Sequence, residues 1–275
     1  MLQRVSVLLA VAGLTAVASA SIYDFNGLHM RYRNFNDYPD SNINATVTAN
    51  SARIVESMGP GTQKFANRHF AMLSANGGAS ALTLKNNESF KVSYKFRLSS
   101  NIDNDGSGQL WPQQPEAGLW FFNNDTGSEY DDDGGIFTVG NGTVFVGGSN
   151  HKFSLIGEAN NGTGAWSKGD IVQVAYTYYA PGVAGALAAY VVQWNNLTSG
   201  LTKTVFNTFD PGDPTRNGFK DGATLGFRFQ HTRNPLVPGG TIHDTEYFDI
   251  SVVPTSSSLA ALALGGLVAA RRRRA

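Results

Sequence analysis

The chain has 275 residues and equal numbers of basic and acidic side chains, 21 of each, so it lacks the basic excess of a nucleic-acid-binding protein. It contains no cysteine, which excludes both a disulfide framework and a thiolate metal site. Its 31 glycines, 17 phenylalanines and 10 tyrosines, with frequent Asn, Thr and Ser, are typical of an all-β protein.

The first 20 residues predict a secretory signal peptide with a helical apolar stretch. Arg4 supplies an early positive charge, residues 5–17 are mostly apolar, and Ala18-Ser19-Ala20 is a small-residue cleavage motif. We therefore expect the Sec translocon to export the chain. Signal peptidase, recognising Ala18 and Ala20, would cut after Ala20. A permanent N-terminal anchor is the weaker interpretation, because the apolar run is short.

The middle of the chain predicts strands separated by turns. Residues 88–99 are the clearest case, because apolar side chains alternate with Lys, Ser and Arg, which indicates one buried and one solvated face. Asn-Gly and Asp-Gly pairs mark hairpin turns between strands. The remaining predicted strands are 22–25, 52–55, 69–73, 81–84, 117–122, 135–139, 143–146, 152–156, 171–179, 186–194, 201–206, 223–230 and 245–253. So many strands in one domain require two packed sheets or a barrel.

This arrangement resembles the concanavalin A-like jelly rolls of legume-type lectins, laminin G modules and laminarinase-type glycosidases. The resemblance rests on the strand at 90–98, on 117–122 (Ala-Gly-Leu-Trp-Phe-Phe) and on a closing strand at 247–252. It implies an all-β, two-sheet antiparallel β-sandwich over residues 21–252. We expect the closing strand to pair with a strand near the N-terminus, such as 22–25. The fold hosts both binding proteins and enzymes.

The acidic segment at residues 123–134 is the candidate for catalysis. If it is extended, Glu129, Asp131 and Asp133 share one face at a spacing of about 6.6 Å. The resemblance to laminarinase-type enzymes implies Glu, Asp and Glu on such a face, with the outer pair as nucleophile and acid/base. Here Asp133 replaces the second Glu and two glycines follow at once. A solvated acidic loop explains the segment better, and a glycoside hydrolase is the alternative.

Two acidic clusters offer oxygen ligands for calcium. Asp103 and Asp105 open an EF-hand-like pattern whose later Glu is missing, and Asp131 and Asp133 form the second cluster. Calcium takes about six to eight oxygen ligands, often from loops. Solvated turns are the simpler interpretation, so the sequence predicts no obligatory cofactor and leaves calcium as the alternative.

The four tryptophans divide by their predicted position. Trp111 and Trp166 fall in predicted loops and are the candidates for stacking on a sugar ring. Trp120 and Trp194 fall on predicted strands and are expected in the core. The five histidines form no His-x-x-x-His pair, so the sequence gives no support for a zinc hydrolase.

The C-terminal 23 residues, 253–275, have three parts. A Pro/Ser hinge at 253–258 precedes an apolar segment at 259–270, and Arg271, Arg272, Arg273 and Arg274 follow. The apolar segment would form a helix of about 18 Å, whereas a hydrocarbon core is about 30 Å thick. Arginine is costly to carry across that core, so the block would stay on the cytoplasmic side. The sequence thus predicts a marginal, transient membrane anchor.

This tail resembles the PEP-CTERM sorting signal that bacterial exosortases process. Val253-Pro254-Thr255 stands where that family has Pro-Glu-Pro, although Thr255 replaces the Glu and a serine replaces the second Pro. The resemblance implies an exosortase-type protease as a partner and a mature protein at the cell envelope or surface. Our hypothesis is an exported, non-catalytic β-sandwich that binds polysaccharide or serves structurally.

Overall fold

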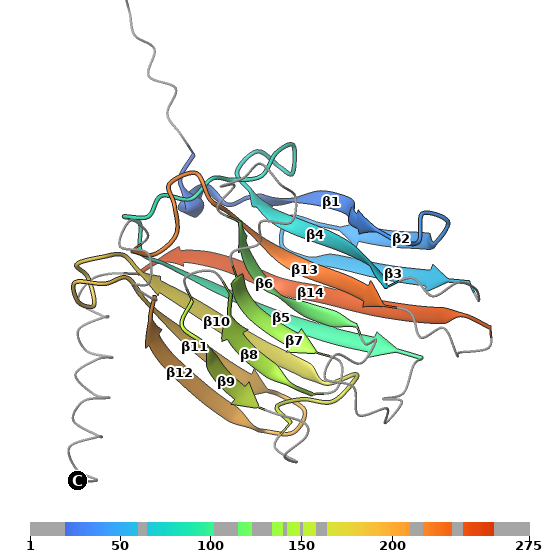
Figure 1. The fold of residues 1–275 in the computed structure, drawn as a ribbon. Coiled ribbons are helices and arrows are strands. Elements are labelled where there is room, and N and C mark those ends of the chain that lie inside the picture. Colours follow the sequence, from blue (N-terminus) through green and yellow to red (C-terminus); the bar gives the residue numbers. More distant parts are fainter. Residues whose placement is uncertain are drawn as a thin grey trace, which may run out of the picture.

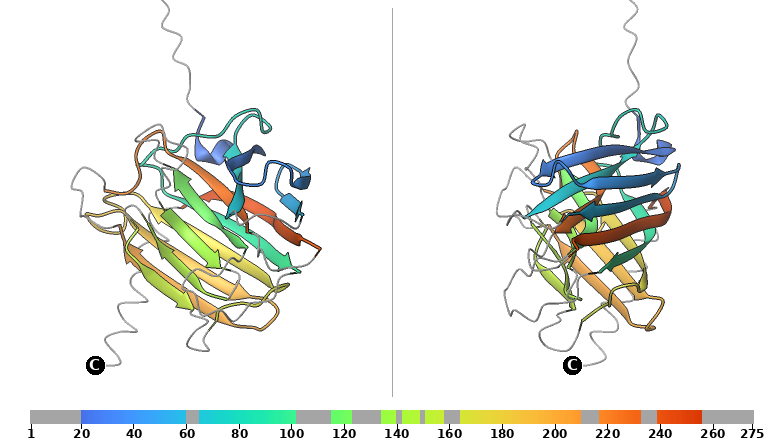
Figure 2. Two further views of the ribbon diagram at one scale, coloured as in Figure 1. Left: turned by 45° about the vertical axis from the view of Figure 1, so that its right-hand side comes forward. Right: turned by 90° about the vertical axis from the view of Figure 1, so that its right-hand side faces the viewer.

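The computed structural model describes residues 20–59, 65–101, 115–122, 134–139, 142–148, 151–157, 164–209, 217–232 and 239–255. In this part of the chain, two 7-stranded antiparallel sheets pack face to face, as Figures 1 and 2 show. The predicted all-β, two-sheet antiparallel sandwich is therefore confirmed. The predicted signal helix and C-terminal helix lie outside the described residues.

We name the two sheets A and B. Sheet A contains, in spatial order, β1 (Gly27–Asn36), β4 (Ala66–Ser74), β13 (Thr224–Thr232), β6 (Glu116–Phe122), β7 (Gly134–Val139), β8 (Val144–Gly147) and β9 (Ser154–Gly157). Sheet B contains β12 (Thr202–Thr208), β11 (Ala189–Asn196), β10 (Ile171–Tyr179), β5 (Phe90–Ser100), β14 (Thr241–Pro254), β3 (Ala52–Met58) and β2 (Asn42–Val47). The chain crosses repeatedly between the sheets, which matches a jelly roll.

β5 lies at the centre of sheet B, and the alternation of its side chains explains which of its faces is buried. Its residues are buried and partly buried in turn along nearly the whole strand, as the sequence predicts. β10 and β14 pair with it in antiparallel register on its two sides. One face of β5 therefore packs in the core, and the other forms part of the outer surface of sheet B.

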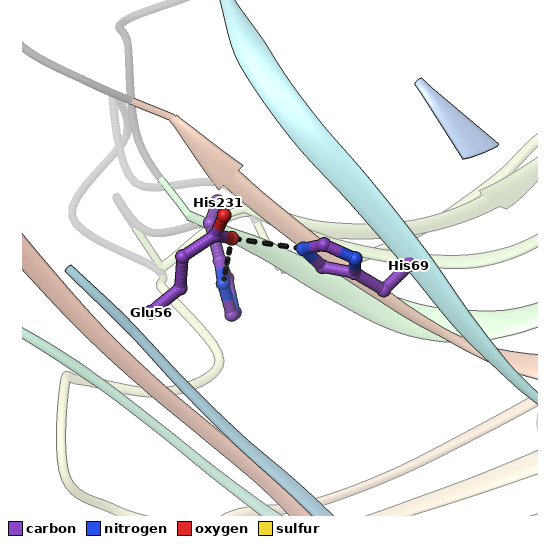
Figure 3. Close-up of side chains that lie close together, drawn as sticks. All are labelled: Glu56, His69 and His231. Carbon is purple, nitrogen blue, oxygen red and sulfur yellow. Dashed lines mark hydrogen bonds and ion pairs between the residues drawn. The ribbon is translucent and has the colours of Figure 1, made fainter. Parts of the chain in front are cut away.

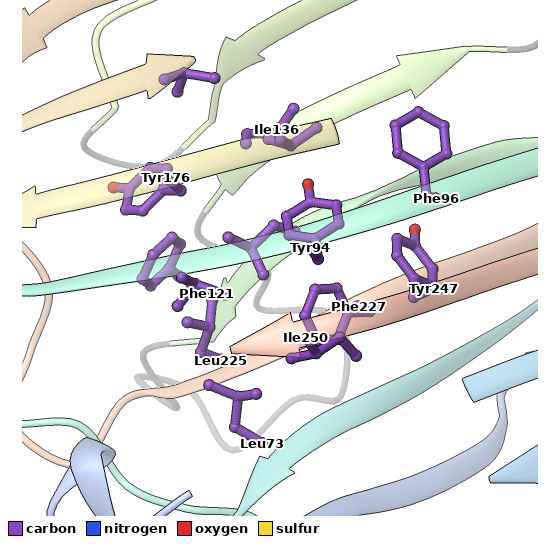
Figure 4. Packing of buried hydrophobic residues seen from close by; sticks show 14 of the residues in the cluster. Leu73, Tyr94, Phe96, Phe121, Ile136, Tyr176, Leu225, Phe227, Tyr247 and Ile250 are labelled. Carbon is purple, nitrogen blue, oxygen red and sulfur yellow. The ribbon is translucent and has the colours of Figure 1, made fainter. Parts of the chain in front are cut away.

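Aromatic side chains from both sheets fill the space between them (Figure 4). The Tyr94 ring of β5 and the Tyr247 ring of β14 lie 5.0 Å and 4.9 Å from the Phe227 ring of β13, measured between centroids. Burying a Phe-sized side chain stabilises a fold by about 1.5–3 kcal/mol.

Tyr247 also ties the two sheets through its hydroxyl group. The hydroxyl accepts a hydrogen bond from the Gly118 N–H at 2.6 Å and donates to the Arg228 carbonyl oxygen at 2.5 Å. Gly118 and Arg228 are partners across the β6–β13 pair. A residue of sheet B is therefore anchored between two strands of sheet A.

The N-terminal part of the sandwich departs most from the sequence predictions. Residues 22–25 were predicted as a strand, but Ile22–Asp24 is a 3-10 helix, η1, whose N-cap is Ser21. The Ser21 N–H donates to the Asp24 carboxylate at 2.7 Å, which favours a turn over an extended chain. The prediction that the closing strand pairs with 22–25 is also wrong, because β14 pairs with β3 and β5.

Two further differences concern edge elements. The predicted strand at 81–84 is reduced to a single bridge between Thr83 and Thr224. The edge strands β1 and β2 were not predicted, because neither shows a clean apolar–polar alternation. An edge strand is paired on one side only, so hydrogen bonds to its neighbour hold it without a strong burial pattern.

Val253 and Pro254 are the last two residues of β14, so this strand extends into the predicted hinge. The Thr255 N–H then donates to the Ser89 carbonyl oxygen at 3.2 Å. Among the described residues, no helix is both long and apolar enough to cross a membrane.

Candidate functional site

Most residues that the sequence analysis singled out lie outside the described residues. They are Ala18, Asp103, Asp105, Trp111, Glu129, Asp131, Asp133, Arg271, Arg272, Arg273 and Arg274. The catalytic alternative, the two calcium clusters and the arginine block therefore stay predictions. Ala20 is described and is exposed, beside the N-cap of η1.

Trp166 contradicts its predicted role as an exposed stacking residue. Its side chain is only 4% exposed and belongs to the main core. Its ring meets the Phe96 ring edge-on, with centroids 6.2 Å apart. The loop around it folds inward, because the carbonyl of the neighbouring Ala165 accepts hydrogen bonds from the Trp194 ring and the Asn196 amide. Trp166 therefore offers no ring face to a ligand.

Trp194 lies in the main core as predicted, and Trp120 is buried as predicted, but in a different cluster. Trp120 is 2% exposed, yet it belongs to a separate apolar cluster with Phe70, Met72 and Phe122. Its neighbour Leu119 points into the main core, and neighbouring strand residues face opposite ways. Trp120 therefore lies on the outer face of sheet A.

Four aromatic rings form a row across the outer face of sheet A. Trp120 of β6 lies 4.7 Å from Phe137 of β7, and Phe137 stacks on Phe145 of β8 at 4.6 Å, measured between ring centroids. Phe145 lies 5.7 Å from Phe153, just before β9. We call these four residues the aromatic row.

Exposure rises along the aromatic row. Trp120 is 2% exposed and Phe153 is 65% exposed, with Phe137 and Phe145 at intermediate exposure. Leu155, which pairs with Phe145 across β8 and β9, is 46% exposed. The row thus ends in an accessible apolar surface.

Charged and amide side chains border the buried end of the row. The Arg228 guanidinium lies 4.3 Å from the Trp120 ring centroid, and that of Arg68 lies 5.7 Å away. Arg228 pairs with the Glu116 carboxylate at 2.6 Å, and Arg68 donates to the Gln230 side-chain oxygen at 2.8 Å. Aromatic faces beside hydrogen-bonding groups suit a ligand with both apolar and hydroxylated surfaces, such as a sugar.

A second group of functional side chains is buried between the sheets (Figure 3). Glu56 of β3 lies between His69 of β4 and His231 of β13. Glu56 Oε2 is 2.8 Å from His69 Nε2 and 2.9 Å from His231 Nδ1. Glu56 Oε1 accepts hydrogen bonds from the Asn67 amide at 2.6 Å and from the Ser41 hydroxyl. We call Glu56, His69 and His231 the buried triad.

Hydrogen bonds determine the protonation of the buried triad. Burial raises the pKa of Glu56, but hydrogen bonds from His231 and His69 outweigh this and hold that pKa below its usual range. Burial lowers the pKa of His231. The Arg33 N–H donates to His69 Nδ1 at 2.9 Å, so the proton of a neutral His69 lies on Nε2 and is donated to Glu56. The triad is therefore a hydrogen-bonded carboxylate.

The buried triad has the donor types of a metal site, and its ligand atoms lie within 4.8 Å of one another. A histidine that binds a metal usually donates its other ring N–H to an acceptor. Here the other nitrogen of His69 faces the Arg33 N–H, which is itself a donor. The residues therefore do not fit a metal centre. His69 and His231 are distant in sequence, so no motif could have indicated their proximity.

No family model and no curated protein matches the chain. Among solved structures, family 7 alginate lyase A1-II' is 11% identical, with 85% of this chain and 96% of that chain aligned and a TM-score of 0.49. Lectin II from Ulex europaeus is 11% identical over 84% of this chain and 96% of its own, with a TM-score of 0.43. An alginate lyase from Aplysia kurodai is 8% identical over 78% and 87%, with a TM-score of 0.44. These values assign neither ligand nor activity to the chain.

Proposed function

We propose that this protein is an exported, non-catalytic β-sandwich that binds polysaccharide through the outer face of sheet A. The observation that carries the proposal is the aromatic row, which runs from buried Trp120 to Phe153, 65% exposed. Neighbouring apolar side chains that stay exposed, such as Phe153 and Leu155, often mark a binding surface.

The chemistry of the outer face supports a sugar ligand. Sugar rings have apolar C–H faces that stack on aromatic rings, and hydroxyl groups that need hydrogen-bonding partners. The exposed ring of Phe153 and the partly exposed ring of Phe145 would supply the first interaction. The partly exposed Arg68 guanidinium, 5.7 Å from the Trp120 ring centroid, would supply the second at the inner end of the row.

The proposal of export rests on the two ends of the chain. The signal peptide would release residue 21 onward, and the PEP-CTERM-like tail would deliver the domain to an exosortase-type protease. The described sandwich begins next to the first predicted cut and ends at Thr255, next to the second. Both cuts would therefore fall outside the paired strands or at the end of β14.

A binding assay tests the function. We expect a screen of the domain at residues 21–254 against immobilised glycans to identify a ligand, and Phe153→Ala with Phe145→Ala to weaken its binding at least about tenfold. Tyr32→Ala is the matched control, because Tyr32 is 48% exposed on β1, at the opposite edge of sheet A. Equal binding by the row variant and the control would overturn the assignment of this face.

Measurement of the intact mass tests the proposed export and processing. In a bacterium that carries the sorting protease, the intact mass of surface material should lack residues 1–20 and end near Pro254. Deletion of Arg271–Arg274 should leave some chains fully translocated, because arginine no longer opposes passage. A surface product that still ends at Ala275 would contradict processing of the tail and leave the binding proposal untouched.

A further inference from the structure

We propose that the outer face of sheet B holds a second glycan site, specific for a neutral, hydroxyl-rich chain, which lets the protein bridge two polysaccharide strands. The site is a groove of about 270 Å³ that crosses β5, β10, β11 and β12. The bridging rests on the function proposed for the aromatic row, whereas ligand binding in the groove does not.

The strand register explains why a hollow forms at this place. Ala175 lies opposite Ser93 on one side and Gln193 on the other. Its methyl group is the floor between longer side chains, because alternate residues of a strand point to the same face. Gln173, two residues earlier on β10, lies opposite Asn195. Four neighbouring strands therefore present short and long polar side chains around one depression.

Several side-chain amide groups in the groove are available to bind a ligand. Gln173 and Gln193 are exposed, and neither side-chain amide has a hydrogen-bond partner among the described residues. Asn195 accepts from the Thr202 hydroxyl at 3.1 Å, which leaves its NH₂ group to donate. An amide both donates and accepts, as does a sugar hydroxyl, so adjacent amides match the edge of a sugar ring.

The charges on this face favour a neutral ligand. Two of the basic residues on this face are compensated, since Lys95 pairs with Asp249 at 2.8 Å and Arg97 pairs with Glu246 at 2.9 Å. Among the described residues that line the groove, Lys91 is the one charged side chain, beside eight uncharged residues. The chain outside its terminal segments has more acidic than basic residues, which opposes a polyanion. The groove therefore recognises hydroxyl groups rather than carboxylates.

The two sites would face opposite directions. The aromatic row lies on the outer face of sheet A and the groove on the outer face of sheet B, with the core between the two sheets. Figure 2 shows the two sheets packed face to face. One domain could then hold two glycan strands at once, and multivalent attachment of this kind strengthens a matrix without any new contact.

The experiment is NMR titration of the domain at residues 21–254 with neutral gluco- and manno-oligosaccharides and with oligouronates. We expect a neutral oligosaccharide to shift the backbone amides of Gln173, Gln193 and Asn195. Ala175→Leu, which fills the floor, and Gln173→Ala with Gln193→Ala should each weaken this site about tenfold. Asn42→Ala, on β2 at the other edge of sheet B, is the matched control.

The outcomes separate the two sites. Groove shifts that survive in the Phe153→Ala variant, together with loss of polysaccharide cross-linking in either set of variants, would support bridging. Unchanged groove amides with every neutral sugar, or a response to oligouronates alone, would overturn the second site. If the amides of the groove shift but those of the aromatic row do not, the result would instead count against the first proposal.

Discussion

The buried triad and the aromatic row, which Arg68 and Arg228 border, are both candidate sites by residue type, but they differ in access. Glu56, His69 and His231 are each 0% exposed, whereas the row ends in Phe153 at 65%. The triad has the residue types of a catalytic or metal site without a path to solvent. The row has fewer reactive groups and an open surface. The difference teaches that residue type alone does not define a site, because a ligand must also reach it.

The largest expected effect is a loss of stability when the buried triad is disrupted. Glu56→Ala leaves buried donors without their carboxylate acceptor and should lower the free energy of unfolding by about 3–5 kcal/mol. Glu246→Ala is the control, since this surface partner of Arg97 should cost at most about 1 kcal/mol. Urea denaturation measures both. A Glu56→Ala domain as stable as the control would show that the triad is not structural.

Acid should destabilise the interior before it affects the outer face. Burial lowers the pKa of His151 and of His243 to about 3, so the folded state keeps both neutral. The unfolded chain protonates its histidines near pH 6.5, so it binds more protons below that pH and stability falls as pH falls. Each histidine should cost about 2 kcal/mol between pH 6.5 and pH 5.

Unfolding measured at several pH values checks this prediction. His243→Asn should flatten the dependence of the free energy of unfolding on pH by the equivalent of up to one proton. The variant lacks a side chain that takes up a proton only when the protein unfolds. His29→Gln, on the partly buried edge strand β1, is the comparison variant. Stability that stays constant between pH 7 and pH 5 would argue against neutral, buried histidines.

The smallest expected effect on stability lies at the open end of the aromatic row. Phe153→Ala removes a side chain that is 65% exposed, so the free energy of unfolding should change by at most about 0.5 kcal/mol. Trp120→Ala, at the buried end, should cost about 3–5 kcal/mol. If the two variants melted alike, the exposure gradient along the row would be wrong.

Much of the sandwich could be predicted because strand burial is a local property. The alternation at β5 and the apolar runs at β10 and β13 follow from neighbouring residues alone. Residues 22–25 were mistaken for a strand because the Ser21 cap competes with extension and leaves little trace in apolar patterning. β1 and β2 were missed because edge strands depend on their neighbour.

By itself, the sequence determined the all-β class, the positions of most strands and the expectation of two terminal targeting segments, because each depends on a short, contiguous pattern. Only the tertiary structure decided which side chains meet. It brought Glu56 to His69 and His231, which come from different sheets, and sealed them from solvent. It also turned Trp166 into the main core and buried Trp120 in a second apolar cluster on the other face of sheet A, because a loop and a strand face take their direction from what packs against them.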